Sequence, residues 1–475
     1  MSNPTKIAAI IGGGVIGGGW VARFLLAGWD VKLFDPDPEA PRKVGEVLDN
    51  ARRSLPALYD VKLPDEGQLT FASSIKEAVS DASWIQESVP ERLDIKHRIF
   101  GEIQAHCAQD ALIGSSTSGF KPSELSSESE NKSAIFVAHP FNPVYLVPVV
   151  ELVGDAQTLD RASDILDQIL MKPIKVKKEI DAHVADRLLE AVWREALWLV
   201  NDDIATTEEI DDIIRYGFGL RWAQMGLFET YRIAGGEAGM AHFIEQFGPC
   251  LEWPWTKLMD VPELTDELVD KIASQSDAQS GKYSIRALEQ IRDNNLVAMM
   301  RALKTQNWGA GALLNHADKQ LKSANSANTG EQLETVRRVV PVDWTDYNGH
   351  MNEGRYGQVF SDAADFIIEF IGADEDYIKS GLSYFTAETN TNFLQECHAG
   401  DEFYVQTGVL LAEGKKLKLL HEMKSSDGET LATCTQFLLH VDLNTRKSCP
   451  PEAYILKNLE ALRTNYAVAD EQGEA

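Results

Sequence analysis

The chain has 475 residues, a length at which one hydrophobic core stops growing, so two or three domains are expected. Hydrophobic residues make up 44% and charged residues 25%, which excludes the composition of a disordered chain. The formal net charge of −28 makes nucleic acid and anionic membrane surfaces poor candidate partners.

Cysteine usage argues for a reducing compartment. The five cysteines are odd in number and widely spaced, and no CxxC pair occurs, so neither a disulfide framework nor a metal site is expected. The uncharged, glycine-rich stretch from Ile7 to Ala22 has the pattern of a strand and turn and not of a signal or membrane segment. We therefore expect a cytoplasmic protein without a targeting segment.

Residues 1–180 show the pattern of an α/β domain. Short β-branched runs alternate with amphipathic segments of helical length, which predicts parallel βαβ units in a doubly wound sheet, a Rossmann fold. The expected strands are Ile7–Ile11, Val31–Phe34, Trp84–Ser88, Leu112–Ser115 and Ile135–Ala138. From 181 to 322 the β-branched runs vanish and apolar residues recur at helical spacing, which predicts an all-α domain.

The segment 323–334 has linker composition, because it opens with S-A-N-S-A-N-T-G. Residues 335–456 then predict an α+β domain, in which one helix is followed by an antiparallel sheet with Asp427-Gly428 as a hairpin turn. Residues 457–475 are expected to form a tail that frays after Tyr466. The expected elements are a helix at Gly354–Ile371 and strands at Tyr384–Phe393, Glu402–Leu411, Leu417–Lys424 and Thr430–Val441.

A dinucleotide site is predicted at the first strand. Gly12, Gly14 and Gly17 satisfy G-x-G-x-x-G between a predicted strand and a predicted helix, and Asp35 ends the next strand. Glycines let the backbone approach a pyrophosphate at the helix N-terminus, while the acid binds a ribose hydroxyl and repels a 2′-phosphate. NAD is therefore favoured over NADP.

A second motif follows the strand at 135–138. Ala138 to Pro143 reads A-H-P-F-N-P, with a glutamate twelve residues after the histidine, and this stretch resembles the signature of the 3-hydroxyacyl-CoA dehydrogenase superfamily. The resemblance covers roughly Lys6 to Trp308. It implies that His139 is the general base and that Glu151 orients its ring. It also implies that Ser118 and Asn142 lie near the substrate, and that Glu91 and Lys96 lie near the nicotinamide half of the cofactor.

One position departs from the superfamily pattern. Asp186 stands where the acyl-CoA enzymes carry asparagine in N-R-L-L, so a carboxylate beside the pocket would oppose an anionic substrate and favour a cation. Aromatic faces hold quaternary ammonium groups, although any single aromatic here could simply fill a helix contact. The stretches 186–196 and 217–226 resemble the carnitine 3-dehydrogenase family. The candidate substrate aromatics are Trp193, Trp222, Phe228 and Tyr231.

The C-terminal domain carries its own motif. Asp346, Gly349, His350 and Asn352 match the D-x-x-G-H-x-N segment of hotdog-fold acyl-CoA thioesterases, which this domain resembles. The resemblance implies Asp346 as the carboxylate that attacks the thioester or activates water, with His350 and Asn352 in support. A non-catalytic hotdog domain used for dimerisation is the alternative. No G-x-S-x-G elbow occurs, so a serine triad is not indicated.

Fusions of carnitine dehydrogenase with a hotdog thioesterase are similar to this chain over its whole length. The resemblance implies a bifunctional enzyme with small-molecule substrates, L-carnitine with NAD and the thioester betainyl-CoA, and it implies a homodimer. Two alternatives stay open from the residues alone. One is a 3-hydroxyacyl-CoA or sugar-acid dehydrogenase with an inactive hotdog domain, and the other is an NAD-binding structural protein.

Overall fold

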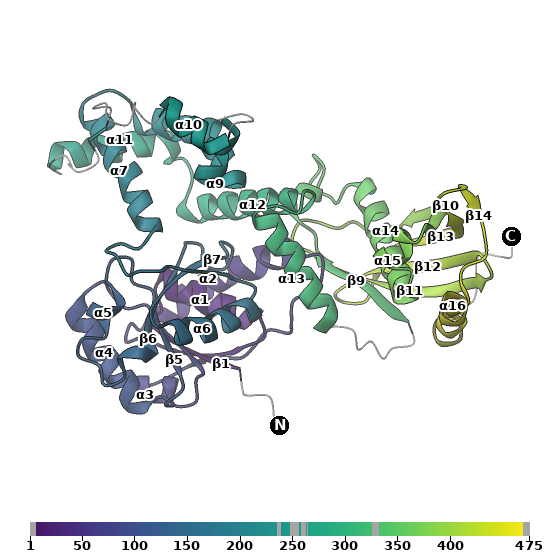
Figure 1. Ribbon diagram of the computed structural model, residues 1–475, viewed down its shortest axis with the longest axis horizontal. Coiled ribbons are helices and arrows are strands. Elements are labelled where there is room, and N and C mark those ends of the chain that lie inside the picture. The colour runs from purple at the N-terminus through teal and green to yellow at the C-terminus, as the bar shows by residue number, and fades with distance from the viewer. Residues whose placement is uncertain are drawn as a thin grey trace. The chain divides into compact units, whose positions relative to one another are not determined.

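The computed structural model describes residues 6–234, 239–247, 256–257, 263, 265–324 and 332–468 (Figure 1). It divides into two compact units. One comprises Met1–Arg52 with Pro64–Asn315, and the other comprises Arg53–Leu63 with His316–Ala475. Among the described residues, no helix is both long and apolar enough to cross a membrane.

The first unit contains an eight-stranded sheet in the order β3-β2-β1-β4-β5-β6-β7-β8. All five predicted strands are present within one or two residues of their expected bounds. The strands are β1 (Ile7–Ile11), β2 (Asp30–Phe34), β3 (Leu69–Phe71), β4 (Trp84–Glu87), β5 (Leu112–Ser115), β6 (Ile135–Pro140), β7 (Val149–Val153) and β8 (Lys172–Lys175). The helices that connect them are α1 (Val15–Leu26), α2 (Ala40–Ser54), α3 (Ile75–Val79), α4 (Leu93–His106), α5 (Pro122–Leu125) and α6 (Ala156–Gln168).

The five predicted strands run parallel, as expected, but the sheet continues beyond β6 with strands that were not predicted. β7 follows β6 and runs antiparallel to it, and β8 then runs parallel to β7. The loop between β6 and β7 is too short to hold a crossover helix, and a parallel partner would need a connection of a dozen or more residues. The antiparallel register sets His139 directly opposite Glu151.

Buried aliphatic side chains from both faces explain why the first strands form. Ala9, Ile11, Ile85 and Ile113 share one core cluster with α3 and α4. Strands buried on both faces read as continuous apolar runs, which is why the sequence located them well. The carboxyl ends of β1, β4 and β5 therefore meet at one edge, where α/β sheets bind their ligands.

The rest of the first unit is helical, as predicted. Tyr145, in the loop after β6, donates a hydrogen bond of 2.8 Å from its hydroxyl to Asp293, a buried residue of α12. The helices are α7 (Ala185–Asn201), α8 (Thr207–Ile213), α9 (Gly219–Ala234), α10 (Gly239–Phe247), α11 (Asp266–Ser280), α12 (Ile285–Lys304) and α13 (Ala310–Ala324), the last of which extends into the second unit.

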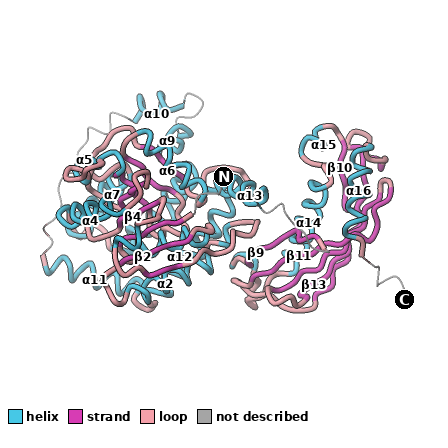
Figure 2. Tube along the Cα trace, turned by 90° about the horizontal axis from the view of Figure 1, so that it is seen from below, coloured by secondary structure: helices cyan, strands magenta, loops and turns pink. Residues whose placement is uncertain are grey.

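The second unit is an antiparallel sheet in the order β10-β13-β12-β11-β9, with the short β14 (Lys447–Ser448) on β13. Figure 2 shows its long strands in magenta with α14 and α16 beside them. The predicted helix and the Asp427-Gly428 turn are present, and Gly428 has a φ of +85°. The elements are β9 (Leu333–Val339), α14 (Glu353–Phe370), α15 (Glu375–Lys379), β10 (Leu382–Phe393), β11 (Glu402–Glu413), β12 (Lys416–Ser425), β13 (Thr430–Asp442) and α16 (Ala453–Tyr466).

Two segments of this unit differ from the sequence interpretation. β9 begins at Leu333, inside the stretch 323–334 that was expected to be linker, because Leu333 and Val336 are buried against the core. α16 occupies much of the expected tail and buries Ile455, Leu459 and Leu462. Three apolar residues are enough to form the buried face of this helix, so the sequence pattern gives only a weak signal for it. The linker residues 325–331 and the tail residues 469–475 lie outside the described part of the chain.

Candidate active sites

The glycine-rich turn joins β1 to α1. A Cβ on Gly12, whose φ is +104°, would lie 2.5 Å from the carbonyl oxygen of Ser88, and one on Gly17 would lie 1.8 Å from that of Gly12. Both positions therefore require glycine. At Gly14 nothing lies within 4 Å of the corresponding point, so the backbone there is open to a ligand. Gly14 is also the N-cap of α1 and supplies no side-chain cap.

Asp35 lies against the same turn. One carboxylate oxygen accepts a hydrogen bond from the backbone N–H of Gly13, and the other accepts one from Asp37 at 2.7 Å. The open backbone at the start of α1 and the acid at the end of β2 fit a dinucleotide, because they offer N–H groups to a pyrophosphate and an acceptor to a ribose.

His139 and Glu151 form a buried pair across β6 and β7. Nδ1 of His139 lies 3.0 Å from Oε2 of Glu151, and both residues are about 5% exposed or less. A carboxylate only accepts hydrogen bonds, so this contact places the ring proton on Nδ1 and leaves the lone pair on Nε2. The predicted base is therefore held in the tautomer that accepts a proton at Nε2.

Glu151 is fixed in turn by the start of α7. Its Oε1 accepts hydrogen bonds from the backbone N–H groups of Val184 at 3.1 Å and Ala185 at 3.0 Å. Burial opposes ionisation of Glu151, but the hydrogen bonds from His139 and these amides outweigh it and keep its pKa below the usual value. The carboxylate is thus charged at neutral pH.

Asp186 lies in the first turn of α7, at the other ring nitrogen of the histidine. Its Oδ2 is 3.8 Å from Nε2 of His139. The structure therefore brings the departure from the superfamily pattern next to the free ring nitrogen of the predicted base. A negative charge at this point favours a positively charged substrate over an anionic one.

His183 is a neighbour of this pair that sequence reasoning missed. Its ring is buried and lies 5.7 Å, between centroids, from the ring of His139. Ala182 and His183 both have positive φ, at 61° and 51°, a conformation that costs energy in residues other than glycine. Burial, with a smaller contribution from the neighbouring His139, lowers the pKa of His183, so this ring is neutral. No sequence signal marks it, because a lone histidine before a helix is not diagnostic.

A buried ionic network joins β4, α4 and β5. Nζ of Lys96 lies 2.8 Å and 3.1 Å from the two carboxylate oxygens of Glu87 and 3.2 Å from Oε2 of Glu91. Lys96 and Glu87 are essentially inaccessible to solvent. Glu87 was not singled out from the sequence, because its partners come from another helix and another strand.

The same network reaches the predicted substrate serine. Oε1 of Glu91 accepts hydrogen bonds from the hydroxyl of Thr117 and from the backbone N–H groups of Ser118, at 3.2 Å, and Gly119, at 3.1 Å. Burial opposes ionisation of Glu91, but the bond from Thr117 and the charge of Lys96 keep its pKa below the usual value.

Of the remaining predicted residues, Asn142 is exposed in the loop after β6. The four candidate aromatics are not assembled into one cage. Trp222 contacts Phe218 and Tyr231 stacks on Phe243, whereas Trp193 and Phe228 are exposed. In the described residues no ring contact joins any two of the four, so a cation cage built from them stays a prediction.

The second unit has a cavity at the start of α14. Asp346 forms a tight turn in which one carboxylate oxygen accepts the backbone N–H groups of Asn348 at 2.8 Å and His350 at 3.3 Å. Asn352 is the N-cap of α14 and accepts a hydrogen bond from Gly354 at 2.9 Å. The cavity of about 490 Å³ is lined by Asp346, His350, Met351, Asn352, Glu353, Tyr356, Phe393, Leu394, Gln395 and Glu396.

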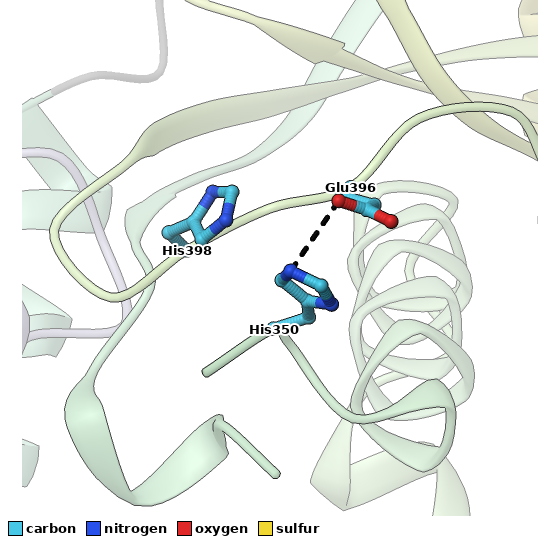
Figure 3. A group of neighbouring side chains, drawn as sticks. All are labelled: His350, Glu396 and His398. Carbon is cyan, nitrogen blue, oxygen red and sulfur yellow. Dashed lines mark ion pairs between the residues drawn. The ribbon is translucent and has the colours of Figure 1, made fainter. Parts of the chain in front are cut away.

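The ring of His350 is supported by residues that sequence reasoning missed. Its Nε2 lies 3.3 Å from Oε2 of Glu396, and its ring packs edge-on against His398 (Figure 3). One ligand atom from each of these three residues falls within 4.8 Å of the others. The ion pair and the ring contact therefore hold the His350 side chain at the edge of the cavity.

Known protein families match both units. The 3-hydroxyacyl-CoA dehydrogenase NAD binding domain matches residues 7–180, the C-terminal domain of the same enzymes matches 183–283, and the thioesterase-like superfamily matches 340–459. A protein of Ruegeria pomeroyi described as "L-carnitine dehydrogenase/betainyl-CoA thioesterase" is 62% identical, over 94% of this chain and 94% of the relative. One of Agrobacterium fabrum with the same description is 57% identical, over 96% of this chain and 94% of its own.

The chain belongs to the L-carnitine dehydrogenase/betainyl-CoA thioesterase family. A shorter relative from Pseudomonas putida, described as an L-carnitine dehydrogenase, is 48% identical and spans 64% of this chain and 96% of its own. Among solved structures, an NAD⁺-dependent dismutase described as 5-formyl-3-hydroxy-2-methylpyridine 4-carboxylic acid 5-dehydrogenase matches with a TM-score of 0.54 and 26% identity. It covers 63% of this chain and 98% of its own.

Family membership confirms the fold and the cofactor that the motifs predicted. The first unit has an NAD-binding domain of the dehydrogenase type, and the second has a thioesterase-like domain. The roles of single residues are not decided by these matches. They depend on the geometry described above and are argued below as proposals.

Proposed function

We propose that this chain is a bifunctional enzyme. Its first unit oxidises the 3-hydroxyl of L-carnitine to the ketone of 3-dehydrocarnitine with NAD, and its second unit hydrolyses betainyl-CoA to glycine betaine and CoA. The near full-length similarity to relatives that carry both activities in their names supports this proposal. The observation that carries the dehydrogenase assignment is the His139–Glu151 pair with Asp186 at the free ring nitrogen.

In the dehydrogenase step, His139 takes the hydroxyl proton at Nε2 while the C3–H bond of the substrate breaks and the C=O bond forms. Glu151 stabilises the resulting imidazolium through Nδ1 and prevents the ring from turning. Asp186 then offers a charge to the trimethylammonium group. NAD, when bound, supplies the acceptor of the hydride that leaves C3.

Several residues would hold the cofactor. Gly14 and the first turn of α1 would receive the pyrophosphate and Asp35 the ribose, since the backbone is open at Gly14 and the acid lies on the same turn. Glu91 and Lys96 would border the nicotinamide half. Lys96 would border it as a buried residue, because its ammonium is already paired with the carboxylates of Glu87 and Glu91.

In the thioesterase step, Asp346 acts as nucleophile or as base for water. One of its oxygens is held by backbone N–H groups, which orients the other. His350, paired with Glu396, and the N-terminus of α14, capped by Asn352, would polarise the thioester carbonyl. Phe393 and Leu394 give the cavity an apolar wall for the acyl chain.

We also propose a homodimer and a cytoplasmic location. β10 forms an edge of the second sheet and pairs only with β13 in the described part of the chain, which leaves a long strand edge open. Exposed edges of this length invite pairing with a second copy. Phe393, at the end of β10, lines the thioesterase cavity. Pairing of two copies along β10 would therefore cover this cavity. The cysteines in the described residues are free, as in a reducing compartment.

The test is a substrate panel on the full chain. NADH formation is measured with L-carnitine, with a 3-hydroxyacyl-CoA and with a sugar acid, and free thiol release is measured with betainyl-CoA. The assignment is supported if His139→Ala loses oxidation of L-carnitine but keeps thiol release. It is supported equally if Asp346→Asn loses thiol release but keeps oxidation of L-carnitine. Preference for the 3-hydroxyacyl-CoA over L-carnitine would contradict it.

A further inference from the structure

Glu87 lies at the point where the cofactor and substrate loops meet. It is the last residue of β4, and the loop that follows passes against Gly12 through the carbonyl of Ser88. One of its carboxylate oxygens accepts a hydrogen bond from the backbone N–H of Val89 at 2.8 Å, which shapes that loop. The hydroxyl of Ser115, the last residue of β5, donates to the other oxygen.

Lys96 connects Glu87 to Glu91. The Lys96 ammonium is directed at three carboxylate oxygens, two from Glu87 and one from Glu91, and its side chain is 1% exposed. It has no spare N–H for the surface. The far oxygen of Glu91 then holds the turn at 117–119 with three hydrogen bonds, and this turn carries Ser118.

We propose that Glu87 is a positioning residue of the dehydrogenase site, which acts through Lys96 and Glu91 to set the substrate turn and the cofactor loop relative to each other. A fully buried ion pair of a carboxylate and an ammonium is a costly way to gain stability, because the desolvation of the two charges offsets much of their attraction. Apolar residues of similar shape in place of Glu87 and Lys96 would stabilise the strand ends equally well. A misplacement of about 1 Å at reacting groups, however, can cost about 100-fold in rate.

The double replacement separates positioning from stability. Glu87→Gln alone leaves a buried cation with a single partner, and Lys96→Met alone leaves a buried anion, so each should lower the melting temperature. Glu87→Gln with Lys96→Met removes both charges and should recover most of that temperature. If Glu87 positions the site, kcat/KM for L-carnitine in the double variant stays down about 10- to 100-fold. The fall should be mainly in kcat, and the calorimetric Kd for NAD should rise.

The matched control is Lys32→Met with Asp81→Asn. Lys32 lies on β2 of the same sheet and Asp81 in the turn after α3, with 2.7 Å between Nζ and Oδ1. This pair is partly exposed and is not part of the network of Glu87, Lys96 and Glu91. It should leave kcat/KM and the Kd for NAD unchanged. Thioester hydrolysis by the second unit reports independently that each variant chain is intact.

Glu91→Gln is the second arm, since Glu91 is 44% exposed in its side chain and its replacement should not prevent folding. It should show the same loss of kcat/KM with an unchanged melting temperature. Recovery of kcat/KM to within about twofold of the parent in the double variant, or full activity of Glu91→Gln, would overturn the proposal. The inference depends on the proposed function only for the assay substrate. If the parent does not oxidise L-carnitine, that function fails, whereas the NAD affinities still test Glu87.

Discussion

Oδ2 of Asp186 lies 3.8 Å from Nε2 of His139, while Oε2 of Glu151 lies 3.0 Å from Nδ1 of the same ring. Both nitrogens of the imidazole thus face a carboxylate. The inner one is buried and hydrogen-bonded, and the outer one is about a quarter exposed on its side chain. In the proposed dehydrogenase site, the inner acid would orient the base and the outer acid would set the charge that a substrate meets.

The first prediction concerns the base. His139→Ala should reduce the oxidation of L-carnitine by about 10²- to 10⁴-fold, the range for loss of a positioned general base. The calorimetric Kd for NAD should stay within about twofold of the parent, because no contact of the glycine turn involves His139. Near-normal turnover would mean that another group takes the proton.

The second prediction concerns Asp186. Asp186→Asn keeps the side-chain shape and removes the charge, so binding of L-carnitine should weaken by about tenfold, or ~1.4 kcal/mol. Binding of the uncharged isostere, in which a tert-butyl group replaces trimethylammonium, should change little. A damaged fold would lower both equally. Equal discrimination by parent and variant would show that the carboxylate is not the partner of the cation.

The third prediction concerns cofactor choice. Asp35→Ser removes the charge that would repel a 2′-phosphate but leaves a hydroxyl beside Gly13. The ratio of kcat/KM with NAD to kcat/KM with NADP should fall by at least about tenfold. An unchanged ratio would assign the selectivity to another residue. Thioester hydrolysis should be the same in parent and variant.

The sequence predicted those parts of the site that lie within one motif. The glycine turn and Asp35 follow from local backbone requirements, and His139 with Glu151 follows from a resemblance that spans twelve residues. Their antiparallel pairing was not foreseen, because it depends on the short loop after β6.

Residues whose partners lie on other elements were missed. The interactions of Glu87 are with residues of β5 and α4, and the ion pair of Glu396 is with His350, just before α14. The cage of aromatic side chains stays a prediction. Trp193 and Phe228 have the residue type of a cation cage, but their side chains are exposed on α7 and α9. Composition cannot say which face of a helix a ring occupies.

The fourth prediction concerns the second unit. Asp346→Asn keeps the acceptor for the backbone N–H groups of Asn348 and His350 but removes the charged oxygen. Betainyl-CoA hydrolysis should fall by about 10²-fold or more, whereas L-carnitine oxidation should be unaffected. Glu396→Gln should cause a smaller loss, because it weakens only the support of His350. Full hydrolysis by Asp346→Asn would exclude this aspartate as nucleophile or base.

The last prediction concerns the stability of the second unit as a function of pH. His421 on β12 is completely buried, with Nδ1 2.8 Å from the hydroxyl of Thr407 and Nε2 3.2 Å from Oε1 of Gln436. Burial lowers its pKa from 6.5 to about 4. Between these values the unfolded chain binds a proton that the folded chain does not, so the free energy of unfolding decreases as the pH falls.

The full contribution of His421 is therefore present above a pH of about 6.5 and is lost by about pH 4, a change of about 3 kcal/mol. His421→Gln keeps an amide N–H that can donate to Gln436 and cannot titrate, so the variant should lose less stability than the parent between about pH 7 and pH 4.5. This difference is measured by urea unfolding, with hydrogen exchange of the β12 amides as the readout. His316→Gln, at an exposed histidine of α13, is the control and should behave like the parent. If parent and His421→Gln lose equal stability on acidification, the buried imidazole of His421 contributes nothing to the acid sensitivity of this unit.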